Sequence, residues 1–316
     1  MNMRAFALLG PTASGKTALA LQLAQHFPCE IISLDSALVY RGMDIGTAKP
    51  SAAERAAVPH HLIDIISPVQ HYSAADFVRD CVRLVGDIRA RGRIPLIVGG
   101  TMMYFHALTQ GLNSLPEADA AVRAELQRQK QQYGLSHLYK QLQEIDPDTA
   151  ARLQAADSQR IERALEVFLL TGKPLSRHFA EQQAAPVLDL FTLTLMPAQR
   201  ERLHENIALR FKQMLQNGFL DEVRQLQRDY PELTADMPSM RCVGYRQAWD
   251  FLQQPSADKD WIEKGIAATR QLAKRQLTWL RKLPADAVCD PFAEPPSAVF
   301  QAACNGLQNF FRDDLP

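Results

Sequence analysis

Cysteine is scarce and scattered in this 316-residue chain, and its distribution argues against two kinds of scaffold. There are five cysteines, an odd number, and no CxxC pair occurs. Structural zinc sites and disulfide frameworks need closely spaced or evenly paired cysteines, so neither is expected. Reduced thiols in a cytoplasmic protein are the simpler interpretation. The five positions are Cys29, Cys81, Cys242, Cys289 and Cys304.

Long apolar runs and a net charge are missing as well. No stretch approaches the roughly 20 apolar residues of a membrane-spanning helix, and the opening MNMRAFALLG is too short and too soon interrupted for a signal peptide. The 35 basic residues balance 35 acidic ones. That balance alone argues slightly against a nucleic-acid partner, although an average conceals local patches. Repeats and low-complexity linkers are also absent, and we expect a cytoplasmic monomer.

What the chain does contain is an alternation of strand and helix patterns. Its hydrophobic fraction of 47% is enough for a large core. Buried strands and amphipathic helices that alternate predict an α/β fold, a parallel sheet with right-handed crossovers. The segments are strands at 4–9, 30–34 and 93–98 and helices at 16–27 and 74–91.

The pattern changes near Pro116. From there to Gln183 only helical patterns occur, at 117–132, 136–144, 147–154 and 158–170, and a strand pattern returns at 187–195. We therefore predict an all-helical insertion at 116–184. The catalytic core would then comprise 1–115 and 185–316, with further helices completing the chain.

A phosphate-binding loop is the firmest motif. The octapeptide GPTASGKT fits GxxxxGK[ST] and stands between a strand and a helix, where backbone N–H groups and a helix N-terminus can cradle an anion. Lys16 adds a full charge, and the Thr17 hydroxyl can hold Mg²⁺. The predicted fold is therefore like that of P-loop NTPases. The predicted phosphate-binding residues, which the family resemblance given below assigns to a diphosphate, are Gly10, Pro11, Thr12, Ala13, Ser14, Gly15, Lys16 and Thr17.

The loop alone does not say which phosphate it holds. A nucleoside triphosphate is the default, so a kinase or ATPase acting on RNA or a small molecule is one hypothesis, and an RNA-binding module that senses a nucleotide is another. A GTPase would carry an NKxD-type motif, which is absent. The one apolar run that ends in an acid is IISLD, which places Asp35 where open α/β sheets bind ligands. A helix cap or a turn would also account for Asp35.

Several motifs together resemble the bacterial tRNA dimethylallyltransferases. They are GPTASGKT, DSALVYRGMDIGTAKP, PHHLID, VGGTMMY, QRIER, RCVGYR and RQLAKRQLTWL, in this order over nearly the whole chain. The resemblance implies transfer of a dimethylallyl group from dimethylallyl diphosphate to N6 of the adenosine 3′ of the tRNA anticodon, position 37. It also implies the catalytic residues, which are Asp35 as the base and Lys16, Thr101 and Arg210 at the diphosphate.

Arg210 has independent support from helical spacing. Leu203, Ile207, Arg210 and Met214 share one face of a predicted helix, and an arginine in an apolar stripe needs an anion. Two alternatives stay open for this arginine: its side chain could extend to solvent, or it could pair with an acid such as Glu222.

A basic segment provides the RNA-binding patch that the overall charge conceals. Residues 264–282 carry six basic residues and no acid, and aromatic and guanidinium groups together suit stacking on unpaired bases. The alternative is a solvated face whose tryptophan packs in the core. The predicted tRNA-binding residues here are Lys274, Arg275, Gln276, Trp279 and Arg281.

The resemblance implies further tRNA contacts outside this segment. Arg160 and Arg163 lie opposite an apolar stripe in the predicted insertion, so we expect both to be exposed and free. The helical insertion and the basic helix argue against an enzyme that prenylates free adenine nucleotides, which needs neither. The implied residues are Asp35, Ser36, Ala37, Leu38, Thr101, Arg123, Gln159, Arg160, Ile161, Glu162, Arg163, Arg241, Cys242, Val243, Gly244, Tyr245 and Arg246.

Overall fold

The computed structural model describes residues 3–111, 115–181, 188–254 and 260–312. The chain forms two compact units, one of Met1–Thr109 with Val187–Pro316 and one of Gln110–Pro186. The insertion that the sequence predicts, 116–184, begins six residues after the start of the second unit and stops two residues before its end. Among the described residues, no helix is both long and apolar enough to cross a membrane.

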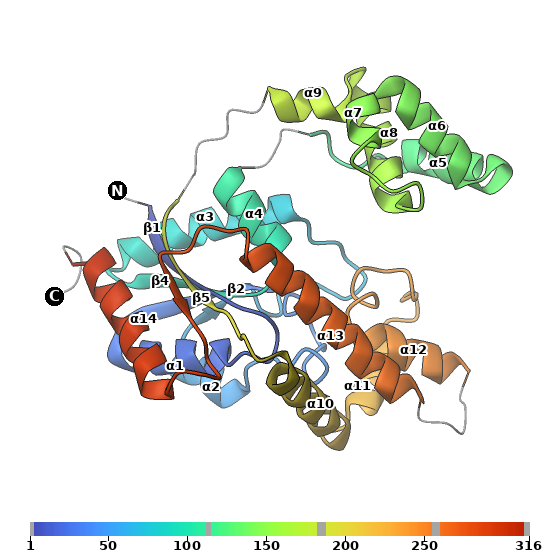
Figure 1. Ribbon diagram of the computed structural model, residues 1–316. Helices are drawn as coiled ribbons and strands as arrows, with labels where there is room; N and C mark the ends of the chain where they lie inside the picture. The colour runs from blue at the N-terminus through green and yellow to red at the C-terminus, as the bar shows by residue number, and fades with distance from the viewer. Residues whose placement is uncertain (1–2, 112–114, 182–187, 255–259, 313–316) are drawn as a thin grey trace. The chain divides into compact units, whose positions relative to one another are not determined.

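The first unit is built on a six-stranded parallel sheet with the order β3-β2-β4-β1-β5-β6 (Figure 1). The predicted α/β fold is thus confirmed. Two strands were not predicted, β3 and β6, because two or three residues are too few to show a pattern. The strands are β1 (Arg4–Leu9), β2 (Cys29–Leu34), β3 (His60–His61), β4 (Ile94–Gly99), β5 (Asp189–Leu195) and β6 (Ala287–Cys289).

Helices cover both faces of this sheet (Figure 1), which explains why its central strands β1 and β4 are apolar apart from Arg4 at the start of β1. Phe6 and Leu8 of β1 pack with α1 (Lys16–His26) and α14 (Pro296–Phe310). The alternate residues Ala5, Ala7 and Leu9 pack with α3 (Ala74–Ala90) and α4 (Met102–Gln110). Successive side chains of β1 point to opposite faces of the sheet, so they pack into two separate cores. The short α2 (Ala52–Ala57) begins with a capping box at Ser51.

A third core joins four helices to the loop that follows β2. It contains Val39, Tyr40 and Met43 of the loop together with apolar residues of the helices, such as Phe211 and Phe219. This packing holds the loop at the carboxyl ends of β1, β2 and β4, where ligands bind in such sheets. The helices are α10 (Arg200–Gln216), α11 (Phe219–Asp229), α12 (Tyr245–Gln253) and α13 (Asp260–Leu280).

The second unit is helical in its described part and has its own core, which includes Leu126, Leu138, Leu142, Ile161 and Leu165. The predicted helix at 147–154 is shorter than expected: only its first turn forms, capped by the Asp146 carboxylate. The final short helix was not predicted. The helices are α5 (Ala120–Tyr133), α6 (Leu135–Ile145), α7 (Pro147–Ala150), α8 (Ser158–Thr171) and α9 (Leu175–Ala180).

Candidate active site

The phosphate loop connects β1 to α1, as the sequence predicts. Gly15 has φ 89° and Ala13 has φ 62°, and these left-handed conformations curl the backbone so that its amides can face an anion. The buried Ser14 donates its hydroxyl to the Pro11 carbonyl at 2.9 Å. Lys16 Nζ donates to the same carbonyl at 2.6 Å. The loop is therefore held in shape by its own side chains.

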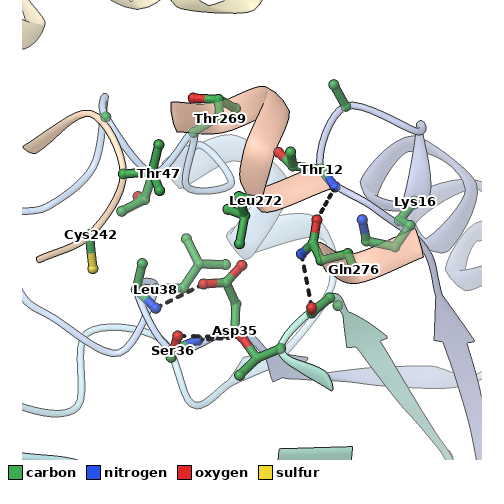
Figure 2. A pocket seen from close by; sticks show the side chains of 18 of the residues that line it. Thr12, Lys16, Asp35, Ser36, Leu38, Thr47, Cys242, Thr269, Leu272 and Gln276 are labelled. Atoms are coloured by element: carbon green, nitrogen blue, oxygen red, sulfur yellow. Dashed lines mark hydrogen bonds between the residues drawn. The ribbon is translucent and has the colours of Figure 1, made fainter. Parts of the chain in front are cut away.

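A cavity of about 560 Å³ opens beside this loop (Figure 2). All four predicted catalytic residues line it, although they come from four separate segments: Lys16 on α1, Asp35 after β2, Thr101 before α4 and Arg210 on α10. Apolar side chains of α10 and α13, such as Phe211 and Leu272, complete part of the wall. The cavity thus combines an anion cradle, a carboxylate and an apolar surface.

Asp35 and Thr101 lie on adjacent loops that are hydrogen-bonded together. Asp35 Oδ1 accepts from the Ala37 amide at 2.8 Å, so the residue does stabilise a turn, and its side chain still lines the cavity. The Ser36 amide donates to Thr101 Oγ1 at 3.0 Å (Figure 2). The carbonyl of Leu34 accepts from the Thr101 amide at 3.1 Å. These bonds fix the position of the Asp35 carboxylate.

The charges in the cavity leave a place for an anion. The pKa of Lys16 is lowered to about 7, chiefly by burial and also by Arg210, while Asp35 opposes the shift. Burial likewise lowers the pKa of Arg210, again opposed by Asp35. Two cations thus share a single nearby carboxylate, and a bound diphosphate would supply the missing negative charge.

We expect the binding of a diphosphate at pH 8 to take up close to one proton, because Lys16 is largely neutral in the free protein and becomes charged beside the anion. The uptake should shrink as the pH falls below 7, where Lys16 is already protonated. Calorimetry in two buffers of different ionisation enthalpy measures it. The Lys16→Arg variant, whose side chain stays charged, shows how much of the proton uptake comes from the diphosphate itself. Equal uptake in both proteins would contradict the prediction.

Comparison with known proteins identifies the family. Residues 38–283 match the family model described as IPP transferase, and residues 3–64 match a model described as isopentenyl transferase. The chain belongs to the IPP transferase family. A tRNA dimethylallyltransferase of Neisseria meningitidis serogroup A is 68% identical over 94% of this chain and 95% of its own. One from Burkholderia ambifaria is 55% identical over 98% of this chain and 95% of its own.

Solved structures agree with this assignment. The tRNA isopentenylpyrophosphate transferase of Bacillus halodurans superposes with a TM-score of 0.70 at 34% identity, covering 99% of this chain and 98% of its own. A eukaryotic dimethylallyltransferase acting on tRNA gives 0.82 at 28% identity, covering 99% and 80%. The predicted resemblance is confirmed. This IPP transferase is an enzyme, and the family favours prenyl transfer over the kinase or ATPase alternative.

The basic helix α13 of this IPP transferase exposes its cations and its tryptophan. Trp279 is 40% exposed, touches His106 edge-on at 5.5 Å between ring centroids, and lines the cavity with Arg275. The alternative in which the tryptophan packs in the core is therefore wrong. Among the described residues, no carboxylate pairs with Lys274, Arg275 or Arg281. The helix consequently offers an uncompensated positive surface at the edge of the cavity.

Gln276 differs from its neighbours on α13. Its Oε1 accepts from the Thr12 amide at 2.9 Å, and its Nε2 donates to the Gly100 carbonyl at 2.8 Å (Figure 2). The side chain thus braces the phosphate loop against the loop after β4, and its amide is already occupied by protein. The prediction of a tRNA contact did not foresee this, because Thr12 and Gln276 are 264 residues apart.

The predicted tRNA-contact segment 241–246 is exposed only in part. Arg241 is exposed, and Cys242 and Val243 line the cavity. Gly244 and Tyr245 are buried, and the Tyr245 hydroxyl donates to Glu222 Oε1 at 2.5 Å. Arg246, partly buried, donates to the Ala235 carbonyl at 2.9 Å and pairs with Asp250. Gly244 has no side chain, and the Tyr245 hydroxyl is bound to Glu222 although Tyr245 also lines the cavity, so an RNA contact by these two residues stays a prediction.

The helical unit also corrects an expectation. Arg163 was expected to be free, but its guanidinium pairs with Glu166 Oε2 at 2.6 Å and donates to the Pro116 carbonyl at 2.7 Å. Arg123 binds the same buried carboxylate at 2.8 Å. Glu166 lies three residues further along the same helix, a spacing at which the pair could have been predicted, whereas the Pro116 carbonyl is 47 residues away and could not. Ile161 is fully buried in the unit's core, whereas Gln159 and Arg160 are exposed, Arg160 near Asp157 at 3.4 Å.

Glu162 and Arg210 have partners that the sequence did not indicate. Glu162 accepts from Lys130 at 2.8 Å. Arg210 does not pair with Glu222; its Nη2 donates to the Thr47 carbonyl at 3.1 Å. Glu222 instead binds backbone amides of the loop before Thr47. Thr47 and Glu222 are functional candidates that sequence reasoning missed.

Proposed function

We propose that this IPP transferase moves a dimethylallyl group from dimethylallyl diphosphate to N6 of adenosine 37, immediately 3′ of a tRNA anticodon, and releases diphosphate. The observation that supports the proposal is the meeting of Lys16, Arg210 and Asp35 at one cavity beside the phosphate loop. An anion cradle next to a carboxylate suits a diphosphate leaving group and an amine nucleophile. The cell compartment expected for a tRNA substrate is the cytoplasm.

Asp35 is the proposed general base. The exocyclic amine of adenine is a poor nucleophile because its lone pair is delocalised into the ring. As N6 forms its bond to C1 of the allyl group, it must lose a proton, and a carboxylate within hydrogen-bond reach can accept it, typically for about 10²–10⁴-fold in rate. Asp35 has its Oδ1 held by the Ala37 amide. A fixed carboxylate of this kind can both orient the amine and take its proton.

The phosphate loop, Lys16, Arg210 and Thr101 are the proposed leaving-group site. When the bond between C1 and the bridging oxygen breaks, its electron pair goes to the diphosphate, and preorganised donors stabilise that charge. The loop residues 10–17 supply backbone amides, except for Pro11, which has none, and Thr12, whose amide donates to Gln276, and the two cations supply full charges. In this proposal the loop holds a leaving group and hydrolyses no nucleotide.

Prenyl transfer from a diphosphate generally uses a divalent metal ion, and we propose Mg²⁺ with Thr17 as its protein ligand. The Thr17 side chain is exposed in the first turn of α1 and lines the cavity. The described residues hold no group of three His, Cys, Asp or Glu side chains that could bind a metal. A site of one hydroxyl, diphosphate oxygens and water suits Mg²⁺, which keeps several waters. The ion would neutralise charge on the diphosphate.

Each of the two units contributes residues to the proposed tRNA contacts. Around the cavity these are 35–38, Thr101, Arg241 to Val243 and the basic residues of α13. In the helical unit they are Gln159, Arg160 and the pair Arg123 and Arg163 on Glu166. Because N6 of a stacked base is inaccessible to a cavity, the base must leave the anticodon stack to react.

Incubation of the protein with Mg²⁺, unmodified tRNA and dimethylallyl diphosphate tests the proposal. Nucleoside mass spectrometry should find one five-carbon addition to adenosine and the release of diphosphate. Consumption of ATP without this addition would support the kinase or ATPase alternative and end the proposal. Activity on free AMP equal to that on tRNA would show that the tRNA surface is misassigned.

A triple variant of α13, Lys274→Gln with Arg275→Gln and Arg281→Gln, is expected to weaken tRNA binding more than tenfold and to flatten its salt dependence. Removing three phosphate contacts should reduce the slope of log K against log salt by about 2, at roughly 0.7 per contact with single strands. Filter binding across a salt series measures both. The matched control is Lys264→Gln on the same helix, since Lys264 already pairs with Asp260 at 2.6 Å. An unchanged slope in the triple variant would contradict this RNA surface.

A further inference from the structure

Glu222 on α11 binds three consecutive backbone amides of the loop after β2. Its Oε2 accepts from Asp44 at 2.9 Å and from Ile45 at 2.6 Å, and its Oε1 accepts from Gly46 at 3.1 Å. The Tyr245 hydroxyl donates to Oε1 as well, at 2.5 Å. Successive amides that converge on one carboxylate form an anion cradle, and this cradle is filled by the protein itself.

The loop is pressed closely against the helices that carry these groups. A Cβ atom on Gly46 would lie 2.2 Å from the Phe219 ring and 2.7 Å from the Tyr245 ring. Both rings are fully buried. Glycine is therefore required at position 46 for the backbone to reach Glu222, and the burial of Tyr245 has a structural reason.

The segment just beyond this cradle forms part of the active-site wall. Gly46, Thr47 and Ala48 line the cavity, and the Thr47 carbonyl accepts from Arg210 Nη2 at 3.1 Å. The position of the Thr47 carbonyl therefore decides where the remaining guanidinium donors point.

Lys49 secures the outer side of the same loop independently of Glu222. Its Nζ contacts the Tyr40 carbonyl at 2.8 Å, Asp44 Oδ1 at 2.6 Å and Asp64 Oδ1 at 2.5 Å. The Lys49 side chain is only 2% exposed. Loss of the Glu222 contacts should consequently shift the loop without unfolding it.

We propose that Glu222 is a positioning residue for the donor diphosphate. It holds residues 44–47 so that Arg210, docked on the Thr47 carbonyl, points into the cavity near Lys16. Glu222 itself touches neither substrate. The inference rests on the proposed function, because it assigns Arg210 to the diphosphate.

The test is Glu222→Gln in the full-length protein. An amide has one oxygen, and its NH₂ group would face backbone amides that are themselves donors, so part of the cradle is lost. The Kd for inorganic diphosphate with Mg²⁺ and the KM for dimethylallyl diphosphate should rise at least tenfold. The Kd for tRNA should stay within about twofold, a split that a general loss of folding would not produce.

Two other variants show whether the effect comes from the contacts between Glu222 and the loop, from a general change in α11 or from the Tyr245 hydroxyl. Asp221→Asn is the matched control, since Asp221 lies next to Glu222 on α11 but is exposed and pairs with Arg224; it should match the wild type. Tyr245→Phe removes only the hydroxyl that donates to Glu222 and leaves the three hydrogen bonds from backbone amides. Its effect on diphosphate binding should therefore be much smaller than that of Glu222→Gln.

Three outcomes would overturn the inference: unchanged diphosphate binding in Glu222→Gln, equal losses of diphosphate and tRNA binding, or an equally large effect of Tyr245→Phe. The last would assign the effect to the 241–246 segment instead of the loop. Failure of the proposed function would be visible separately, because the wild-type protein would then bind diphosphate without prenylating tRNA.

Discussion

Replacing Asp35 by alanine is expected to lower kcat by about 10²- to 10⁴-fold, the usual contribution of a general base. The affinity for tRNA should change much less, because the exposed cations of α13 lie elsewhere on the same unit. The affinity for diphosphate should hold or improve, since the carboxylate acts electrostatically on Lys16 and Arg210. Single-turnover kinetics with saturating tRNA and donor measure the chemical step directly.

The control for this prediction is Asp35→Asn. Asparagine keeps an oxygen that can accept from the Ala37 amide at the position of Oδ1, so the turn is preserved while the base is removed. Both variants should therefore be slow. A normal rate in the asparagine variant would mean that the residue acts only through the turn. A loss of tRNA affinity as large as the loss of rate would assign Asp35 to recognition.

Removing either cation of the diphosphate site is the second large effect expected. Lys16→Met or Arg210→Ala should lower kcat by about 10²–10³-fold, the cost of losing one preorganised donor to a developing anion. The two effects should not add, because Arg210 lowers the pKa of Lys16, so that loss of Arg210 leaves Lys16 more fully charged.

A double variant and a surface control make this prediction decisive. The Lys16→Met, Arg210→Ala double variant should lose more than the product of the single losses in kcat, measured by diphosphate release, because the more fully charged Lys16 partly compensates for the loss of Arg210 in the single variant. Arg224→Ala is the control, since Arg224 is exposed and pairs with Asp221 at 2.6 Å, and it should have normal activity. Strict additivity would mean that the two cations act on separate steps.

Local patterns in the sequence were sufficient to predict the phosphate loop, Asp35 and Arg210 as parts of the site. The phosphate loop depends on eight consecutive residues, and Asp35 follows a buried strand directly, so short-range rules place both at the carboxyl edge of a parallel sheet. Helical spacing marked Arg210 as a candidate, because an arginine in an apolar stripe needs an anion, and the family resemblance implied its role at the diphosphate. Residues of the loop, Asp35 and Arg210 all line one cavity, while their catalytic roles stay predictions.

Partners far apart in the sequence could not be predicted in the same way. Helical spacing placed Arg163 on an exposed face, yet its guanidinium also donates to the Pro116 carbonyl, 47 residues away. Gln276 stands among basic residues in the sequence, but it braces a loop 264 residues away. A periodic pattern indicates the face of an element, whereas a hydrogen bond also depends on what packs opposite that face.

The sequence by itself determined the parallel sheet, the phosphate loop, the basic helix and the family. Each of these depends on residues adjacent in the chain or repeated at the period of one helix or strand. Only the tertiary structure decided that Glu222 holds the loop at 44–46 and that Arg210 docks on Thr47. The physical reason is that packing of α10, α11 and α12 against the loop after β2 brings together groups more than 160 residues apart, and no local pattern encodes that packing.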